Sequence, residues 1–197
     1  MYNHLELLLL ANRYHLQPLH VHLTSIEKNY RTKSALEDDD RVYASFHKSH
    51  FLDLFPRKDL VYLTADGPPM KEFDTKCTYI IGGIGDFGTE KYTTLKFAKK
   101  HGLRYASFPI SDYFSAPNID LRAYCVHSIL LEMYLHGSWK EAFIKHLPHM
   151  FTLLKDVATD SDIKLRENCL TKEHSDKEWF RNSEKIVNIL KGKRAII

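Results

Sequence analysis

One glycine-rich turn in this chain presents a single carboxylate after an apolar segment. Residues 79–81 (Tyr-Ile-Ile) lead into residues 82–85 (Gly-Gly-Ile-Gly), and Asp86 is the only charged residue of the turn. Glycine has no Cβ, so a chain segment of this kind can turn tightly and approach a ligand closely. Enzymes built on parallel sheets form cofactor-binding edges in this way. The turn therefore predicts a cofactor site, although an aspartate at this position could also simply cap the turn.

The same turn satisfies a second pattern, G-x-G-x-x-G at residues 83–88, which is typical of dinucleotide-binding proteins. Asp112 follows at roughly the distance that this fingerprint requires. However, Asp86 would place a negative charge inside the loop that must hold a pyrophosphate, which opposes binding. A dinucleotide site is therefore the disfavoured alternative.

The elements on either side of the turn predict how it is held. Strand-like segments at 60–64, 79–81 and 103–110 are separated by loops and by a helix-like segment at 89–102. Strand, turn, helix and strand make one βαβ unit, and the alternation predicts an α/β fold with a parallel sheet covered on both faces. Further strands are expected at 19–24 and 41–46, and further helices at 1–12, 25–36, 49–55, 121–135 and 138–147.

Composition sets the class of protein. With 197 residues, 44% hydrophobic and 27% charged, the chain suits one α/β domain with a substantial core. The net charge of +3 permits a polyanionic partner without establishing one. Basic residues gather in and after the helix that follows the glycine turn: Lys91, Lys96, Lys99, Lys100, His101 and Arg104. They predict a basic surface near the site, with a solvated helix face as the alternative.

Other classes of site are not indicated. Cys77, Cys125 and Cys169 form no paired motif, so the sequence predicts neither a disulfide framework nor a zinc ribbon, which fits a reducing compartment. Histidine pairs have spacings that a metal could use, but no carboxylate or cysteine cluster accompanies them, and no metal is expected. The longest apolar run falls far short of the roughly 20 residues that a bilayer requires, so no membrane partner is expected.

Several motifs that occur in order resemble the Trm10 family of tRNA methyltransferases. They are SHFLDLFP (49–56), LVYLTAD (60–66), YIIGG (79–83) with Asp86, TLKFA (94–98), FPISDY (108–113) and GSWKEAF (137–143). The resemblance covers residues 1–148, and an ordered set is far more specific than any single motif.

The resemblance implies a SPOUT fold, in which a parallel sheet is flanked by helices and the C-terminal part is threaded into a trefoil knot that holds S-adenosylmethionine. The methyltransferase domain would cover residues 1–150. Residues 151–197 would form a charged, mostly helical C-terminal extension, with a helix expected from Asp176 to Lys191. The implied cofactor-binding residues are Leu63, Thr64, Gly82, Gly83, Phe108, Pro109, Ile110, Tyr124 and Cys125.

The resemblance also implies a reaction. Family members methylate N1 of the purine at position 9 of tRNA, and the base must leave its stacked setting to reach the pocket. Guanine N1 carries a proton, so its reaction benefits from a general base, and Asp86 stands where the family's candidate aspartate does. Adenine N1 carries no proton and could react through positioning alone. The implied RNA-binding residues are Lys91, Lys96, Lys100, Arg104 and Arg122.

Two functions stay open at this point. Relatives carry an Asn-Gln pair where this chain has Tyr124 and Cys125, so two amides that can bond the cofactor and base are absent. The chain is then either an active S-adenosylmethionine-dependent tRNA (purine-9) N1-methyltransferase or a catalytically weak or inactive SPOUT module that binds tRNA and scaffolds a nuclease complex.

Within the family, the mitochondrial branch looks closest. That branch supplies the methyltransferase subunit of protein-only mitochondrial ribonuclease P, which acts in tRNA 5′ processing. The resemblance therefore implies a mitochondrial location, a short-chain dehydrogenase subunit and a protein-only ribonuclease P nuclease as partners, and a protein that is monomeric by itself.

Overall fold

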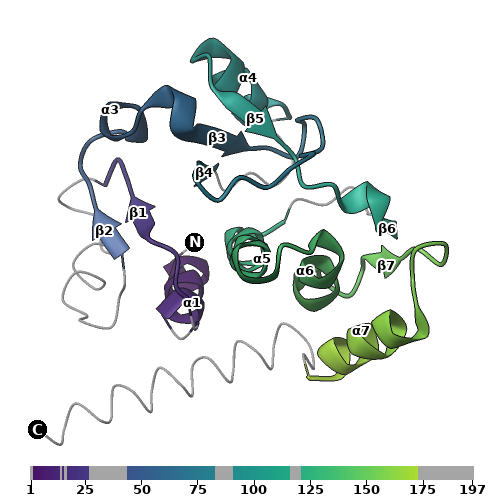
Figure 1. Ribbon diagram of the computed structural model, residues 1–197. Coiled ribbons are helices and arrows are strands. Elements are labelled where there is room, and N and C mark those ends of the chain that lie inside the picture. Colours follow the sequence, from purple (N-terminus) through teal and green to yellow (C-terminus); the bar gives the residue numbers. More distant parts are fainter. Residues whose placement is uncertain are drawn as a thin grey trace, which may run out of the picture.

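The computed structural model describes residues 2–13, 15, 17–26, 44–82, 91–115 and 121–172 (Figure 1). Three strands form a sheet with α3 and α4 on one side, while α1, α5 and α6 lie below it in the view of Figure 1. The elements are α1 (Tyr2–Arg13), β1 (Val21–Leu23), β2 (Ala44–Phe46), α3 (Phe51–Leu54), η1 (Arg57–Asp59), β3 (Leu60–Leu63), β4 (Thr78–Ile81), α4 (Thr93–Lys100), β5 (Arg104–Ala106), η2 (Ile110–Asp112), β6 (Phe114–Ser115), α5 (Ala123–His136), α6 (Trp139–His146), β7 (Thr152–Leu153) and α7 (Asp160–Lys172).

The central sheet has the strand order β4-β3-β5, and both pairs are parallel. The predicted βαβ unit is present as β4, α4 and β5, and its crossover passes over β3. β1 and β2 form a separate parallel pair, and β6 and β7 pair antiparallel. The prediction of a parallel sheet flanked by helices is confirmed, while the predicted helix at 25–36 lies almost entirely outside the described residues.

The strand predicted at 103–110 is shorter in the structure. β5 ends at Ala106 because the next amide, that of Ser107, donates to the carbonyl of Pro68 at 2.8 Å rather than to a longer ladder. Pro109 then has no N–H to donate and is followed by the 3₁₀ turn η2. The chain therefore leaves the sheet at the carboxyl end of β5.

One face of the sheet is sealed by aromatic packing. Leu60 and Tyr62 of β3 are buried against Ala98 of α4 and the following Leu103. The rings of Phe51 and Phe97 lie 6.2 and 5.7 Å from the Tyr62 ring, measured between centroids. On the other side of the sheet, α5 contacts β4. A central strand covered in this way must be apolar at every position, as the sequence of β3 is.

α1 packs on α5 and on the β1–β2 pair. Leu8 and Leu9 are buried against apolar residues of both strands and against Ala123 and Tyr124 in the first turn of α5. Asn12 lies on the same helix face and is also buried. Its side chain donates to the carbonyl of Leu19 and accepts from the Leu19 amide, both at 2.8 Å, so a buried amide is satisfied by closing the turn after α1.

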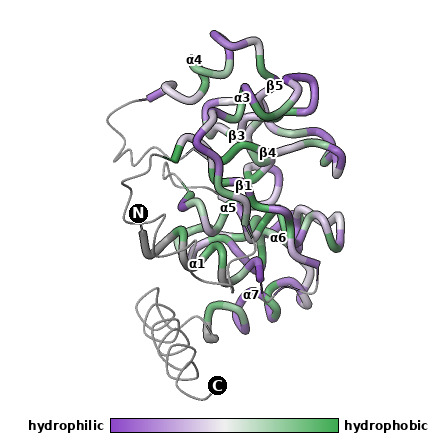
Figure 2. Tube along the Cα trace, turned by 90° about the vertical axis from the view of Figure 1, so that its left-hand side faces the viewer, coloured by the Kyte–Doolittle hydropathy of each residue, from purple (hydrophilic) through white to green (hydrophobic). Residues whose placement is uncertain are grey.

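α5 and α6 carry the largest apolar cluster of the described chain. Ile129 and Met133 of α5 pack with Phe143 of α6 and with Phe114. Glycine and serine form the two helix ends that meet here: Gly137 has φ +67° and ends α5, and the Ser138 hydroxyl accepts from the Glu141 amide at the start of α6. In the hydropathy-coloured view, segments of α5 and α6 are green (Figure 2).

Arg166 fastens α7 to the end of α6. Its guanidinium is buried and donates to the carbonyls of Ile144, Leu147, Pro148 and Phe151 at 2.7–3.3 Å, which satisfies carbonyls that the end of a helix leaves open. The same group lies 5.4 Å from the ring centroid of Phe114.

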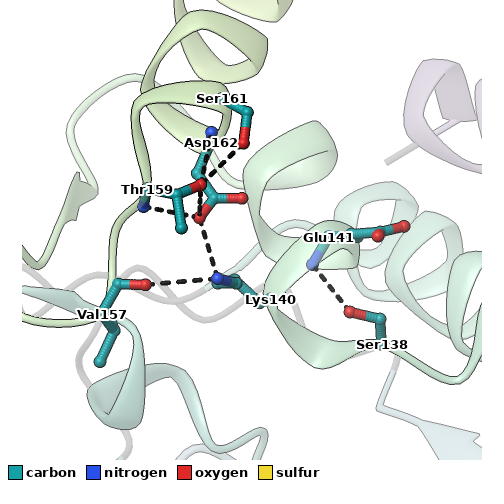
Figure 3. A network of polar contacts seen from close by, with 7 residues as sticks. All are labelled: Ser138, Lys140, Glu141, Val157, Thr159, Ser161 and Asp162. Carbon is teal, nitrogen blue, oxygen red and sulfur yellow. Dashed lines mark hydrogen bonds and ion pairs between the residues drawn. The ribbon is translucent and has the colours of Figure 1, made fainter.

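A second contact joins α6 to α7 (Figure 3). Lys140 donates to the Val157 carbonyl at 3.3 Å and to the Asp162 carboxylate at 2.9 Å. Hydrogen bonds from Lys140 and Thr159 lower the pKa of Asp162 to about 2. The described part of the extension therefore packs against the α6 layer, while the boundary at residue 150 stays a prediction and the helix expected from Asp176 lies outside the described residues.

Protonation of buried His127 should couple folding to pH. Burial, with smaller contributions from His15 and His146, lowers its pKa from 6.5 to about 4, and its ring nitrogens have no hydrogen-bond partner within the described structure. The unfolded chain takes up a proton below pH 6.5, whereas the folded chain does so only near pH 4. The contribution of His127 to stability should therefore be absent above pH 6.5 and amount to a loss of up to about 3 kcal/mol as the pH drops toward 4.

Urea unfolding of wild type, His127→Leu and the exposed control His149→Asn from pH 4.5 to 7.5 tests this expectation. His127→Leu should remove most of the pH dependence between 4.5 and 6.5, and His149→Asn should retain it. Parallel profiles for wild type and His127→Leu would contradict the assignment.

Candidate functional site

Three residues meet at the carboxyl edge of the central sheet. The register pairs Leu63 with both Ile81 and Ala106, so the residues that follow them, Thr64, Gly82 and Ser107, leave the sheet at one level. In open parallel sheets, ligands bind outside the carboxyl ends of the strands. The structure therefore brings together the strand ends at which the sequence predicted a cofactor.

Thr64 ties this edge together. Its amide donates to the Ala106 carbonyl at 3.0 Å, which extends the pairing of β3 with β5 by one residue. Its hydroxyl lies 2.7 Å from the hydroxyl of Thr94 in the first turn of α4. The buried Thr64 side chain thus fixes the start of the helix relative to the ends of two strands.

The space around Gly82 is tight. A Cβ at this position would lie 3.2 Å from the hydroxyl oxygen of Tyr62 and 3.4 Å from Cγ2 of Thr94. Burial raises the pKa of Tyr62, so that hydroxyl stays protonated. The backbone at the end of β4 therefore passes close to β3 and α4 with no side chain of its own.

The loop after β3 is bound to the end of β5. The Ser107 amide donates to the Pro68 carbonyl at 2.8 Å, and the Met70 amide donates to the Ser107 carbonyl at 2.9 Å. Gly67 faces the same strand, and a Cβ there would lie 3.1 Å from the carbonyl carbon of Ala106. Two backbone segments are thus held side by side at the edge, which gives a fixed main-chain surface beside Thr64.

Several predicted cofactor residues have other side-chain roles. The Phe108 ring lies 5.4 Å from the ring of Trp139 and 6.2 Å from that of Phe143, between centroids, and Ile110 packs on the same cluster. Pro109 is buried between them. These side chains pack toward α6, so what this segment can offer a ligand is mainly backbone.

Tyr124 and Cys125 lie in the first turn of α5. Tyr124 packs against the cluster of Leu8 and Leu9, and Cys125 is buried. Gly83 and the predicted catalytic residue Asp86 lie outside the described residues.

The predicted RNA-binding residues divide into two groups. Lys91, Lys96 and Lys100 are exposed before or along α4, and Arg122 is exposed directly before α5. Arg104 begins β5 at the amino edge, where its guanidinium donates to the Lys58 carbonyl and to the Cys77 sulfur. Because Arg104 is the first residue of its strand, it lies at the opposite edge of the sheet from the candidate site. Its position in the sequence, close to the other basic residues, did not show this.

Sequence reasoning missed four residues at this edge: Tyr62, Asp66, Tyr92 and Thr94. Asp66 and Thr94 lie inside motifs that were recognised, but their hydrogen bonds join segments 26 to 30 residues apart. No local pattern encodes such pairs.

No helix within the described ranges combines the length and apolarity needed to span a bilayer.

A family profile described as tRNA (guanine(9)-N(1))-methyltransferase TRM10/TRM10A matches residues 2–150. The chain is 31% identical over 144 residues to rat tRNA methyltransferase 10 homolog A, covering 70% of this chain and 42% of the relative. It is 28% identical over 185 residues to the human homolog A (87% and 54%) and 31% identical over 144 residues to the human homolog C (66% and 34%). The chain thus spans between about a third and a half of these relatives.

Solved structures show the same fold. The crystal structure of full-length spTrm10 in complex with SAH superposes with a TM-score of 0.64 at 25% identity, covering 75% of this chain and 83% of that one. The crystal structure of spTrm10(74) gives a TM-score of 0.65 at 24% identity over the same shares.

Crowding at Gly82 can be tested by a double-mutant cycle. Gly82→Ala should lower the free energy of unfolding by about 1 kcal/mol, because Tyr62 is packed among aromatic rings and cannot retreat from the new methyl group. Tyr62→Phe removes the hydroxyl that the methyl group would meet. In the Tyr62→Phe background, Gly82→Ala should cost clearly less, as measured by urea unfolding. Equal costs in both backgrounds would contradict the described geometry.

Proposed function

Because this chain belongs to the Trm10 family of tRNA methyltransferases, we propose that it transfers a methyl group from S-adenosylmethionine to N1 of the purine at position 9 of tRNA. The observation that carries the proposal is the carboxyl edge formed by Thr64, Gly82 and Ser107, in a fold shared with an SAH-bound spTrm10.

The edge fits a cofactor that is recognised largely by backbone groups. Gly82 lies where a Cβ would be crowded, and the loop at Gly67 is bound tightly to the end of β5. The residues proposed to hold the cofactor are Leu63, Thr64, Gly82, Gly83 and the backbone of Phe108, Pro109 and Ile110. When bound, S-adenosylmethionine supplies an electrophilic methyl group on sulfur. The protein's share is to orient the purine toward it and exclude water.

Asp86 is proposed as the base that guanine requires. A guanine N1 loses its proton on methylation, and a carboxylate in the glycine turn can accept it. Adenine N1 has a free lone pair and needs no such acceptor.

The trefoil knot implied by the resemblance also belongs to this proposal, since residues 83–90 and 116–120 are not among those described.

A second candidate function is a module that binds tRNA but transfers methyl groups weakly or not at all. It is favoured by one observation: in the first turn of α5, Tyr124 packs between α5 and α1 and Cys125 is buried, at the two positions where the resemblance implies an Asn-Gln pair.

The narrower role in mitochondrial ribonuclease P rests on the motif resemblance alone. It would place the chain in mitochondria with a short-chain dehydrogenase subunit and a protein-only nuclease. Human homologs A and C match with 28% and 31% identity and so do not distinguish the branches. Reconstituting tRNA 5′ cleavage with and without this chain would test the role, and unchanged cleavage would contradict it.

A methyl-transfer assay separates the two candidate functions. The chain is incubated with methyl-labelled S-adenosylmethionine and tRNA transcripts carrying G, A or U at position 9. The proposal expects label at N1 of G9 or A9 and none in the U9 transcript. Binding of tRNA without transfer to any transcript would support the scaffold function instead.

Removing the proposed base should affect one substrate selectively. Asp86→Asn should slow methylation of G9 tRNA by roughly 10²- to 10⁴-fold in single-turnover rate and leave A9 tRNA within about twofold. If G9 is the only wild-type substrate, the pH–rate profile gives the same information, because a rate that depends on Asp86 as base falls when the carboxylate is protonated. An equal loss for both purines would show that Asp86 acts in folding or binding.

The two groups of cations should differ in their salt dependence. Lys96→Gln should weaken tRNA binding and reduce the slope of log K against log salt concentration by about one, because an exposed cation that contacts a phosphate releases a counterion. Arg104→Gln should leave the slope unchanged, since its guanidinium is engaged at the amino edge. Fluorescence anisotropy measures both slopes at salt concentrations from about 50 to 300 mM, a range that includes physiological ionic strength. A larger slope change for Arg104→Gln would contradict the division.

A further inference from the structure

Tyr92 carries the most exposed large apolar side chain in the described part of the protein. Its relative exposure is 52%, whereas the other exposed examples, Tyr134, Met150, Ile163 and Leu165, range from 36% to 43%. A single exposed aromatic residue is ordinary on a protein surface, so the case for Tyr92 rests on its backbone and on its place beside the candidate site.

The backbone at Tyr92 is strained. Its φ and ψ of +65° and +8° lie in the left-handed region, which a tyrosine rarely adopts and which glycine adopts at little cost. The Asp66 carboxylate holds this conformation by accepting the Tyr92 amide at 3.1 Å. The Tyr92 carbonyl then begins α4 by accepting the Lys96 amide at 2.8 Å.

A chain of contacts places this residue at the rim of the candidate site. Asp66 follows Thr64 and donates its amide to the Thr64 hydroxyl at 3.4 Å. The Thr64 hydroxyl is also hydrogen-bonded to the hydroxyl of Thr94, and the methyl group of Thr94 lies next to Gly82. Tyr92 is therefore fixed to the carboxyl edge through Asp66.

Exposed cations stand close to Tyr92 along the chain. Lys91 precedes it, and Lys96, whose amide bonds the Tyr92 carbonyl, lies in the first turn of α4. An exposed aromatic ring beside lysines is the combination by which proteins hold unpaired nucleotides, with the base on the ring and the phosphates on the cations.

We propose that Tyr92 stacks on a base of the tRNA substrate at the rim of the site and that Asp66 is the residue that positions it. This inference rests on the proposed function for its ligand. An RNA base is favoured over the adenine of the cofactor, because small-molecule pockets bury most of their ligand, whereas this ring is more than half exposed.

Replacing Tyr92 with glycine distinguishes stacking from a structural role, because stability and tRNA affinity are then expected to change in opposite directions. Tyr92→Gly relieves the backbone strain and should raise the urea midpoint of unfolding. It should also weaken tRNA binding about tenfold, as expected for the loss of one base stack. Tyr92→Phe keeps the ring and should bind tRNA within about twofold of wild type.

Fluorescence anisotropy with labelled tRNA and calorimetric titration with S-adenosylhomocysteine provide the readouts. The affinity for S-adenosylhomocysteine should be the same in wild type and both variants. A Tyr92→Gly protein that binds tRNA like wild type would overturn the proposal, and so would one that loses affinity for S-adenosylhomocysteine instead. Wild type that binds tRNA but transfers no methyl group would overturn the proposed activity alone; wild type that binds no tRNA would overturn the stacking.

Variants of Asp66 test the positioning role. Asp66→Ala removes the acceptor of the Tyr92 amide and should weaken tRNA binding, whereas the side-chain oxygen of Asp66→Asn can still accept and should restore it. If Asp66 acts through the ring, Asp66→Ala should add little to the loss already caused by Tyr92→Gly. Fully additive losses would show that Asp66 acts independently of Tyr92.

Discussion

The architecture of the candidate site depends on Thr64. Its amide extends the pairing of β3 with β5, and its hydroxyl fixes the first turn of α4 through Thr94. Because this threonine is buried, both interactions form away from bulk solvent and hold three elements in one arrangement. The glycine after β4 then lies close to Tyr62 and Thr94, and Asp66 accepts from Tyr92, the N-cap residue of α4. A cofactor edge made mainly of backbone needs this kind of support, since it has few side chains of its own to position a ligand.

The helices below the sheet hold the other side of this edge. Phe108 anchors the segment after β5 by packing on Trp139 and Phe143, so the backbone that faces the site is fixed by the α6 core. Arg166 in turn satisfies carbonyls at the end of α6 and binds α7 to it. The described part of the C-terminal extension thus stabilises, through α6, the layer on which the proposed cofactor segment is packed.

Local signals explain how much of this could be predicted. The apolar run of β3, the Ser138 cap and Gly137 act over a few residues, and the corresponding elements were placed correctly. The early end of β5 could not be predicted, because it depends on hydrogen bonds between Ser107 and the loop that holds Pro68 and Met70, far earlier in the chain. The role of Arg104 required strand direction, and the hydrogen bond between Asp66 and Tyr92 required tertiary structure. The assignment of Asp86 stays a prediction.

We propose above all that the carboxyl edge of the sheet binds the methyl donor. Amide chemical shifts of the isotope-labelled chain, recorded while S-adenosylhomocysteine is added, test it directly, because each backbone N–H reports on its own surroundings. We expect the largest saturable changes at Thr64, Gly82, Ser107 and Ile110. Changes concentrated instead at the amino edge, around Lys58, Cys77 and Arg104, or no saturable change at all, would contradict it.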